Sequence, residues 1–194
     1  MSRGRFIAVV GPSGVGKDSV MQAMAAHDPR IVLARRMITR PSNAGGEDFD
    51  GVTVEEFHAL HAAGAFALSW EAHGLHYAIP ATVDAYLQEG RDVLANLSRA
   101  VLIRAKDRFA QFEVINLTAD RDVLAARLAA RGRETAMQIA GRLDRATADL
   151  PDGISALHLD NSGSLDQTVQ TALDHLYPAV TAQAGRAPHK VKCL

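Results

Sequence analysis

The sequence predicts an α/β fold in which a parallel sheet lies between two layers of helices. Short apolar runs that are typical of buried strands occur at residues 6–10, 93–97, 114–117 and 156–159. Stretches with helical periodicity alternate with them, at residues 16–27, 98–107, 120–130, 135–150 and 165–176. Continuous apolar strands that alternate with helices indicate a buried parallel sheet with helices on both faces.

Length and composition predict one globular domain. The chain has 194 residues, of which 47% are hydrophobic and 22% charged, which is enough to bury a sizeable core. The net charge of −1 and the lack of a long apolar run predict neither nucleic acid nor a membrane as partner. The only cysteine is Cys193, so no intramolecular disulfide can form, and we expect a reducing, cytoplasmic location. Nothing in the pattern predicts an oligomeric state.

The predicted domain covers residues 1–180 and has three parts. We expect the core at residues 1–34 and 91–180 and an inserted lobe at about 35–90, where the regular alternation stops. The expected elements of the lobe are two short strands and two short helices, near residues 66–70, 76–79, 54–63 and 82–88. A helical lid is expected at about 121–145, and residues 181–194 read as a flexible tail because they lose periodicity.

A glycine-rich loop follows the first predicted strand and opens the first predicted helix. It comprises Gly11, Pro12, Ser13, Gly14, Val15, Gly16, Lys17, Asp18 and Ser19. Glycines let backbone N–H groups turn onto phosphate oxygens, and the helix N-terminus adds the positive end of its dipole. Lys17 would reach the β- and γ-phosphates as a point charge. The loop therefore predicts an ATP site of the P-loop type, since a glycine-rich turn without a ligand would leave Lys17 unexplained.

The residue after Lys17 departs from the usual motif. That position normally holds Ser or Thr, whose hydroxyl binds Mg²⁺, whereas this chain has Asp18 followed by Ser19. Since Mg²⁺ prefers oxygen ligands, we predict that Asp18 binds the metal directly or through water, with Ser19 as a helper. The alternative is that Asp18 only favours the positive end of the helix dipole, and the sequence leaves both open.

Arginines are concentrated between residues 121 and 145, where the chain has six of them and only three acidic residues. Their spacing places Arg127 with Arg131, and Arg142 with Arg145, on shared helix faces, and Gly132 separates the two helices. Guanidinium groups on a closing lid can neutralise the charge of a transferring phosphate. A solvated helix face with surface ion pairs is the alternative, and the upstream P-loop favours the lid.

The inserted lobe carries a second set of phosphate-binding groups. Arg40 lies at its start in the run Ile-Thr-Arg-Pro, and Tyr77 lies in the later run His-Gly-Leu-His-Tyr-Ala. A guanidinium fork and a phenol hydroxyl can together bind a phosphate. Each residue alone is a weak signal, since a tyrosine in an apolar strand is more often part of a core.

With these three sets of residues, the chain resembles the guanylate kinase superfamily over roughly residues 5–178. The matching segments are Gly11–Lys17, Thr39-Arg40, Gly46-Glu47, His73–Ala78, the arginines Arg131 and Arg142, and Asn161. The resemblance implies a P-loop NTPase core with an acceptor lobe and a lid. It also implies a kinase that uses ATP and Mg²⁺, in which Lys17, Arg131 and Arg142 hold the transferring group.

The chain departs from guanylate kinases where that family reads guanine. Two carboxylates that bind the base are replaced by Ser69 and Ser98, and a companion acid is replaced by Asn96. A second arginine expected shortly after Arg40 is also missing. A site that loses its hydrogen-bond partners for a base loses specificity for that base steeply, so we expect this lobe not to read guanine.

One branch of the superfamily, the ribose 1,5-bisphosphate phosphokinases of phosphonate catabolism, is similar to this chain at these positions. The similarity implies transfer of the ATP γ-phosphate to a phosphorylated sugar, giving 5-phosphoribosyl 1-diphosphate. Arg40 and Tyr77 would then bind one acceptor phosphate, and Arg36 or Arg99 the other. Ser69, Asn96 and Ser98 would meet the ribose hydroxyls.

Two other functions stay open from the sequence: a guanylate or other nucleoside monophosphate kinase, and a non-catalytic guanylate-kinase-like binding module. The two serine replacements argue against the first, and the retained Lys17 and lid arginines argue against the second.

Overall fold

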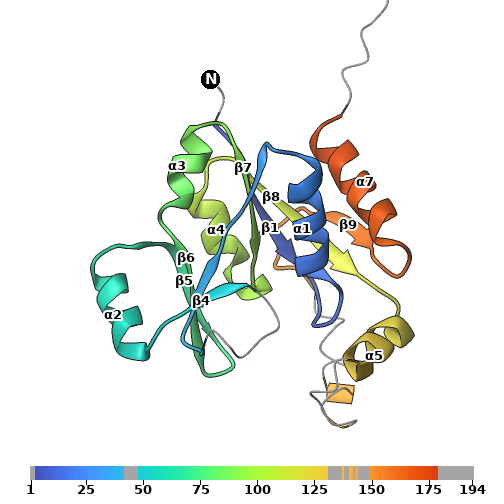
Figure 1. The fold of residues 1–194 in the computed structure, drawn as a ribbon, viewed down its shortest axis with the longest axis horizontal. Coiled ribbons are helices and arrows are strands. Elements are labelled where there is room, and N and C mark those ends of the chain that lie inside the picture. The colour runs from blue at the N-terminus through green and yellow to red at the C-terminus, as the bar shows by residue number, and fades with distance from the viewer. Residues whose placement is uncertain are drawn as a thin grey trace, which may run out of the picture.

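The computed structural model describes residues 3–41, 48–130, 137, 140, 141, 143 and 149–178. Within them, a parallel sheet of five strands has the order β2-β7-β1-β8-β9 (Figure 1). Its strands, in that order, are Ile31–Leu33, Asp92–Asn96, Phe6–Val10, Phe112–Thr118 and Leu157–Asp160. This sheet confirms the predicted α/β class.

Helices cover both faces of this sheet. On one face, Ile7 and Val9 of β1 pack in a core with α1 (Lys17–His27), α5 (Arg121–Ala130) and α7 (Leu165–Leu176). On the other face, Phe6, Ala8 and Val10 pack in a second core with α3 (Val83–Gln88) and α4 (Leu102–Arg108). Since every residue of β1 is buried, the strand has no polar alternation, and the three-layer arrangement agrees with the prediction.

Two details of this part of the chain differ from the sequence prediction. The edge strand β2 was not predicted, because three residues are too few to show a period. The helix predicted at 98–107 is divided into a 3-10 turn, η2 (Arg99–Val101), and α4. Most of the helix predicted at 135–150, and the tail at 181–194, lie outside the described residues. Of the helices that the structure describes, none has the length and apolar composition needed to span a bilayer.

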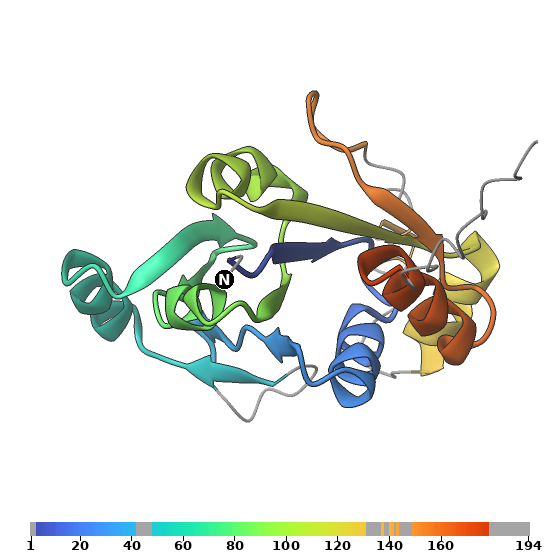
Figure 2. The same cartoon turned by 90° about the horizontal axis from the view of Figure 1, so that it is seen from above.

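A second sheet of four strands, in the order β4-β3-β6-β5, lies beside the first. Its strands, in that order, are Phe49–Gly51, Arg36–Ile38, Leu75–Pro80 and Phe66–Ala72, of which the sequence predicted only the last two. Helix α2 (Val54–Ala62) begins with a capping box of Thr53 and Glu56. Figure 2 shows this sheet and α2 on one side of the parallel sheet, with α5 and α7 on the other side. The bounds of the core, lobe and lid stay predictions.

The hairpin of β5 and β6 decides which lobe residues share a face. Its turn has positive φ at both central residues, 54° at His73 and 72° at Gly74, as a tight two-residue hairpin requires. In the resulting register Trp70 pairs with Tyr77, and Ser69 pairs with Ala78. Because side chains alternate along a strand, Trp70 and Tyr77 lie on one face and Ser69 on the other.

Candidate active site

The P-loop connects the buried end of β1 to the start of α1. Its three glycines all have positive φ: 148° at Gly11, 86° at Gly14 and 96° at Gly16. A Cβ on Gly11 would lie 2.5 Å from the backbone oxygen of Leu117 on β8, so no larger residue fits. The path of the loop therefore requires the glycines of the motif. Of the other loop residues, Pro12 and Val15 are buried and Ser13 is exposed.

Lys17, the first residue of α1, folds back over the start of the loop. Its Nζ donates hydrogen bonds to the backbone oxygens of Gly11, at 2.9 Å, and of Pro12, at 3.1 Å. This places the ammonium group at the loop that the sequence assigns to the phosphates, where a positive charge can contact them.

Asp18 is bound by a residue from the neighbouring strand. Asn96 ends β7 and lies beside Val9 of β1, so its side chain is next to the P-loop. Its Nδ2 donates to Asp18 Oδ1 at 3.0 Å, and within the described residues no other hydrogen bond or ion pair reaches this carboxylate. One oxygen of a half-buried carboxylate thus remains beside Lys17, a donor that suits Mg²⁺. Ser19 is exposed.

The lobe meets the P-loop region through Arg36. This residue of β3 is 9% exposed, and its Nη1 donates to the backbone oxygen of Asn96 at 3.1 Å. Its Cζ lies 5.6 Å from the centre of the Tyr77 ring, which stacks on Trp70 at 5.4 Å. Contacts therefore run from Asp18 through Asn96 and Arg36 to Tyr77. Trp70 belongs to the second core, and it also supports the Tyr77 ring.

Arg40 follows β3, two residues after Ile38, which pairs with Tyr77 of β6. Its Cζ is 4.4 Å from the centre of the Phe49 ring. A joint role of Arg40 and Tyr77 at one phosphate stays a prediction. The arginine with a described contact to the Tyr77 ring is Arg36.

The structure gives a separate environment for each of the three residues expected to meet ribose hydroxyls. The side chain of Asn96 binds Asp18, and Ser98 Oγ accepts a 3.4 Å hydrogen bond from the backbone N–H of Ala100, at the start of η2. Ser69 lies on the face of the hairpin opposite to Tyr77. Their roles at an acceptor stay predictions.

Arg99 is a half-buried cation at the carboxyl edge of the sheet. Burial lowers the pKa of its guanidinium, and the charge of Asp149 offsets part of this effect. Its Nη2 lies 3.5 Å from Asn116 Oδ1, while its Nε is buried and has no hydrogen-bond partner. An unpaired buried donor costs free energy that an anionic ligand nearby could recover. Asn116 was not predicted, and its signal is a polar residue inside the apolar run at residues 114–117.

Asn161 is a second residue whose position the sequence did not explain. It lies just after β9, is 4% exposed, and its Nδ2 donates to the backbone oxygen of Val15 in the P-loop at 2.7 Å. Arg127 of α5 donates to the same oxygen at 3.4 Å. Arg131 and Arg142, the two arginines predicted to be catalytic, lie outside the described residues.

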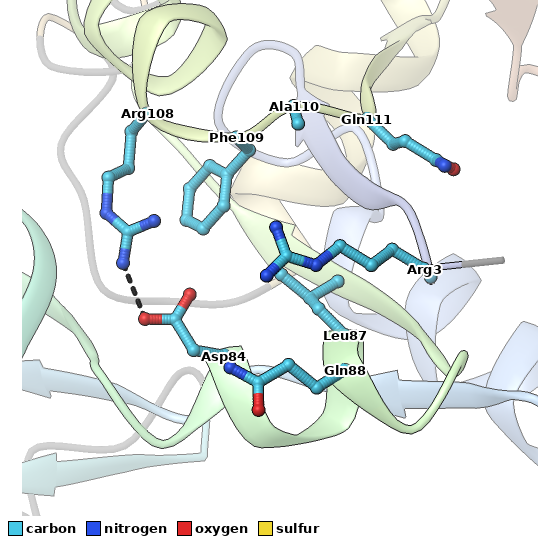
Figure 3. A pocket seen from close by; sticks show the side chains of 9 residues that line it. Arg3, Asp84, Leu87, Gln88, Arg108, Phe109, Ala110 and Gln111 are labelled. Carbon is cyan, nitrogen blue, oxygen red and sulfur yellow. Dashed lines mark hydrogen bonds and ion pairs between the residues drawn. The ribbon is translucent and has the colours of Figure 1, made fainter. Parts of the chain in front are cut away.

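A pocket of about 220 Å³ lies at the opposite edge of the sheet (Figure 3). Its lining includes Gly4 before β1 and Gln111 before β8, so it opens at the amino ends of these strands. Arg108 pairs with Asp84 at 2.5 Å beside it. Since the P-loop follows the carboxyl end of β1, this pocket is not part of the candidate active site.

No family model matches the chain. A ribose 1,5-bisphosphate phosphokinase from Ruegeria sp. is 51% identical over 172 residues, which are 88% of this chain and 90% of that protein. Another, from Chelativorans sp., is 46% identical over 181 residues, or 91% and 87% of the two chains. This chain belongs to the ribose 1,5-bisphosphate phosphokinase family. The membership confirms the resemblance inferred from the sequence.

A longer relative and two solved structures extend the comparison. A bifunctional ribose 1,5-bisphosphokinase-thymidine phosphorylase from Cupriavidus necator is 41% identical and matches 95% of this chain but 31% of its own length. A guanylate kinase from Anaplasma phagocytophilum superposes with a TM-score of 0.66 at 18% identity, over 90% of this chain and 85% of its own. A gluconokinase from Sinorhizobium meliloti gives 0.52 at 18% identity, over 91% and 93%. These structures confirm the guanylate kinase-like fold.

Proposed function

We propose that this chain transfers the γ-phosphoryl group of ATP to ribose 1,5-bisphosphate, which yields ADP and 5-phosphoribosyl 1-diphosphate. The observation that carries the proposal is 51% identity to a phosphokinase of that name over 88% of the chain. The geometry supports it, because the P-loop and the lobe residues Arg36 and Tyr77 are joined through Asn96.

The reaction needs positioning rather than a base. An oxygen of the acceptor's 1-phosphate attacks the γ-phosphorus, and the bond from that phosphorus to the bridging oxygen breaks, so that ADP leaves. Because the attacking oxygen is already anionic, no proton has to be removed, and catalysis depends on alignment and charge neutralisation. In this proposal Lys17, Arg131 and Arg142 hold the transferring group.

The acceptor lies against the lobe in this proposal. Arg36 is a buried guanidinium whose orientation is fixed by Asn96, and Tyr77 offers a hydroxyl that has no hydrogen bond within the described residues. Together they provide a guanidinium group and a phenol hydroxyl that can donate hydrogen bonds to one phosphate. Arg40 and Arg99 are the candidates for the other phosphate.

Asp18 is the proposed protein ligand of Mg²⁺, directly or through a water molecule. The ion would supply positive charge that neutralises the nucleotide phosphates. Asn96 binds one carboxylate oxygen and leaves the other for the metal. This arrangement favours a metal role over a purely electrostatic effect at the helix end, which needs no fixed partner on the strand.

An ADP-release assay with MgATP tests the proposal, with ribose 1,5-bisphosphate and GMP offered in parallel reactions. We expect turnover with the sugar only, and none with a Lys17→Ala variant, which controls for contaminating kinases. Turnover with GMP only would identify a guanylate kinase whose base-reading groups differ from the usual carboxylates. Binding of ATP without turnover of either acceptor would favour a non-catalytic module.

A further inference from the structure

The Val15 carbonyl connects the P-loop to the core through hydrogen bonds. It accepts hydrogen bonds from Asn161 Nδ2 at 2.7 Å and from Arg127 Nη1 at 3.4 Å. Asn161 is itself fixed, because its backbone N–H donates to Thr118 of β8 at 2.8 Å. The second half of the loop is therefore attached to the sheet through one buried amide.

The orientation of that amide is determined by its partners. A backbone carbonyl can only accept a hydrogen bond, so the NH₂ group of Asn161 must face Val15. The amide oxygen then faces Thr168 of α7, whose Oγ1 lies 2.9 Å away and is also buried. Both ends of the Asn161 side chain are therefore bonded inside the protein.

Fixing the Val15 carbonyl also fixes the next N–H group. The C=O and N–H of a trans peptide point in opposite directions, and no cis peptide is present in the described chain. With the Val15 oxygen turned toward buried Asn161, the Gly16 N–H points away from Asn161. Backbone N–H groups are what a P-loop offers to phosphate oxygens.

The close approach of Asn161 to Gly16 supports this reading. Gly16 has a φ of 96°, and a Cβ on it would lie 2.7 Å from Asn161 Nδ2. The amide thus packs against the residue whose N–H it orients. Lys17 binds the carbonyls of Gly11 and Pro12, so the two halves of the loop are held by different residues.

We propose that Asn161 is a positioning residue that keeps the Val15–Gly16 peptide in the orientation that binds nucleotide phosphate, and that Thr168 keeps Asn161 in place. The inference rests on the proposed function only in that it requires ATP to bind at the P-loop. Neither residue touches the substrate.

Thr168 offers a cleaner test than Asn161, whose replacement at a buried site can prevent folding. Thr168→Val keeps the shape of the side chain and removes the hydroxyl, whereas Thr168→Ser keeps the hydroxyl. We expect calorimetric titration with MgATP to show about three- to tenfold weaker binding for Thr168→Val, the range for one lost hydrogen bond, and near wild-type binding for Thr168→Ser. The KM of the sugar acceptor is expected to stay unchanged in both.

Val169→Ala is the control for general loosening of α7. Val169 is 2% exposed on the same helix, so its truncation lowers the melting temperature without removing a partner of Asn161. We expect this variant to bind MgATP like the wild type. Equal weakening by Thr168→Val and Val169→Ala, or unchanged MgATP binding by Thr168→Val, would overturn the inference while leaving the proposed function intact. A wild-type protein that binds no ATP would overturn both.

Discussion

Asn96 donates a 3.0 Å hydrogen bond to Asp18, and this bond joins the end of β7 to the first turn of α1. In the sequence, Asp18 stands where a P-loop usually has a hydroxyl, and Asn96 stands where the related family has an acid. Their contact shows that the two residues are partners, and the pair carries one carboxylate, on the helix.

If this pair holds the metal, Asn96→Ala will weaken Mg²⁺ binding although Asp18 is intact. Loss of a residue that orients a metal ligand typically costs about 10- to 100-fold in metal affinity. Calorimetry measures the Mg²⁺ concentration needed for half-maximal ADP binding. Asp18→Ala, which removes the ligand itself, is expected to raise this concentration further than Asn96→Ala. Gln22→Ala, at an exposed position further along α1, is the control. An unchanged Mg²⁺ requirement in Asp18→Ala would remove the metal role.

Tyr77→Phe is expected to raise the KM of the sugar acceptor by about 10-fold or more, because a hydrogen bond to a charged phosphate is worth about 1.5–3 kcal/mol. The KM of ATP should not change, since Tyr77 lies in the lobe. Phenylalanine keeps the stacking on Trp70, so the fold is preserved. Steady-state kinetics with each substrate varied in turn makes the comparison. A change in the KM of ATP alone would place Tyr77 outside the acceptor site.

Arg131→Ala is expected to reduce kcat by about a thousandfold or more, while ATP binding is largely kept. The reason is that an arginine contacting the transferring phosphoryl group acts mainly in the transition state. Arg104→Ala, an exposed arginine on α4, is the matched control and should retain full kcat. The measurements are kcat under saturating substrates and the Kd of ATP. A near-normal kcat in Arg131→Ala would exclude it from the catalytic set.

The P-loop and the alternation of elements could be predicted because both are local. Gly11 and Gly16 are required by the path of the chain itself, and a buried strand such as β1 shows its burial in its composition. The strands β2, β3 and β4 could not be predicted in the same way. Each has three residues, and their pairing with distant strands, rather than their own sequence, defines them.

The contacts that the site residues make were harder to predict than which residues belong to the site. Asn96 was expected to meet a ribose hydroxyl, which stays a prediction, and its bond to a side chain 78 positions earlier was not foreseen. Arg36 and Tyr77 were placed at separate phosphates, and the pairing of β3 with β6 puts them together. Such contacts depend on strand order and register, which a single sequence shows only indirectly.

Asp92 is the centre of a group of contacts that stabilises the fold. Asp92, at the start of β7, accepts hydrogen bonds from Arg5, through Nη2 at 2.6 Å, and from the Tyr177 hydroxyl at 2.7 Å. The Tyr177 ring is in turn covered by Arg30, whose Cζ is 3.6 Å from the ring centre. These contacts attach the end of α7 to two strands of the sheet. Burial alone would raise the pKa of Asp92, but the hydrogen bonds outweigh it, and the pKa is lowered.

Because its pKa is lower in the folded state, Asp92 stabilises the protein above the pKa of an unfolded aspartate, about 3.9, and this contribution is lost as the pH falls through the folded value. Asp92→Asn is therefore expected to lower the free energy of unfolding by about 1.5–3 kcal/mol at pH 7, since Arg5 loses its buried partner and keeps only its ion pair with the more exposed Glu113. Tyr177→Phe removes one hydrogen bond and should cost about 1 kcal/mol. Urea unfolding of the three proteins between pH 7 and pH 3 measures both effects. The wild type should lose stability in acid more steeply than Asp92→Asn, and parallel curves would show that Asp92 does not carry the acid sensitivity.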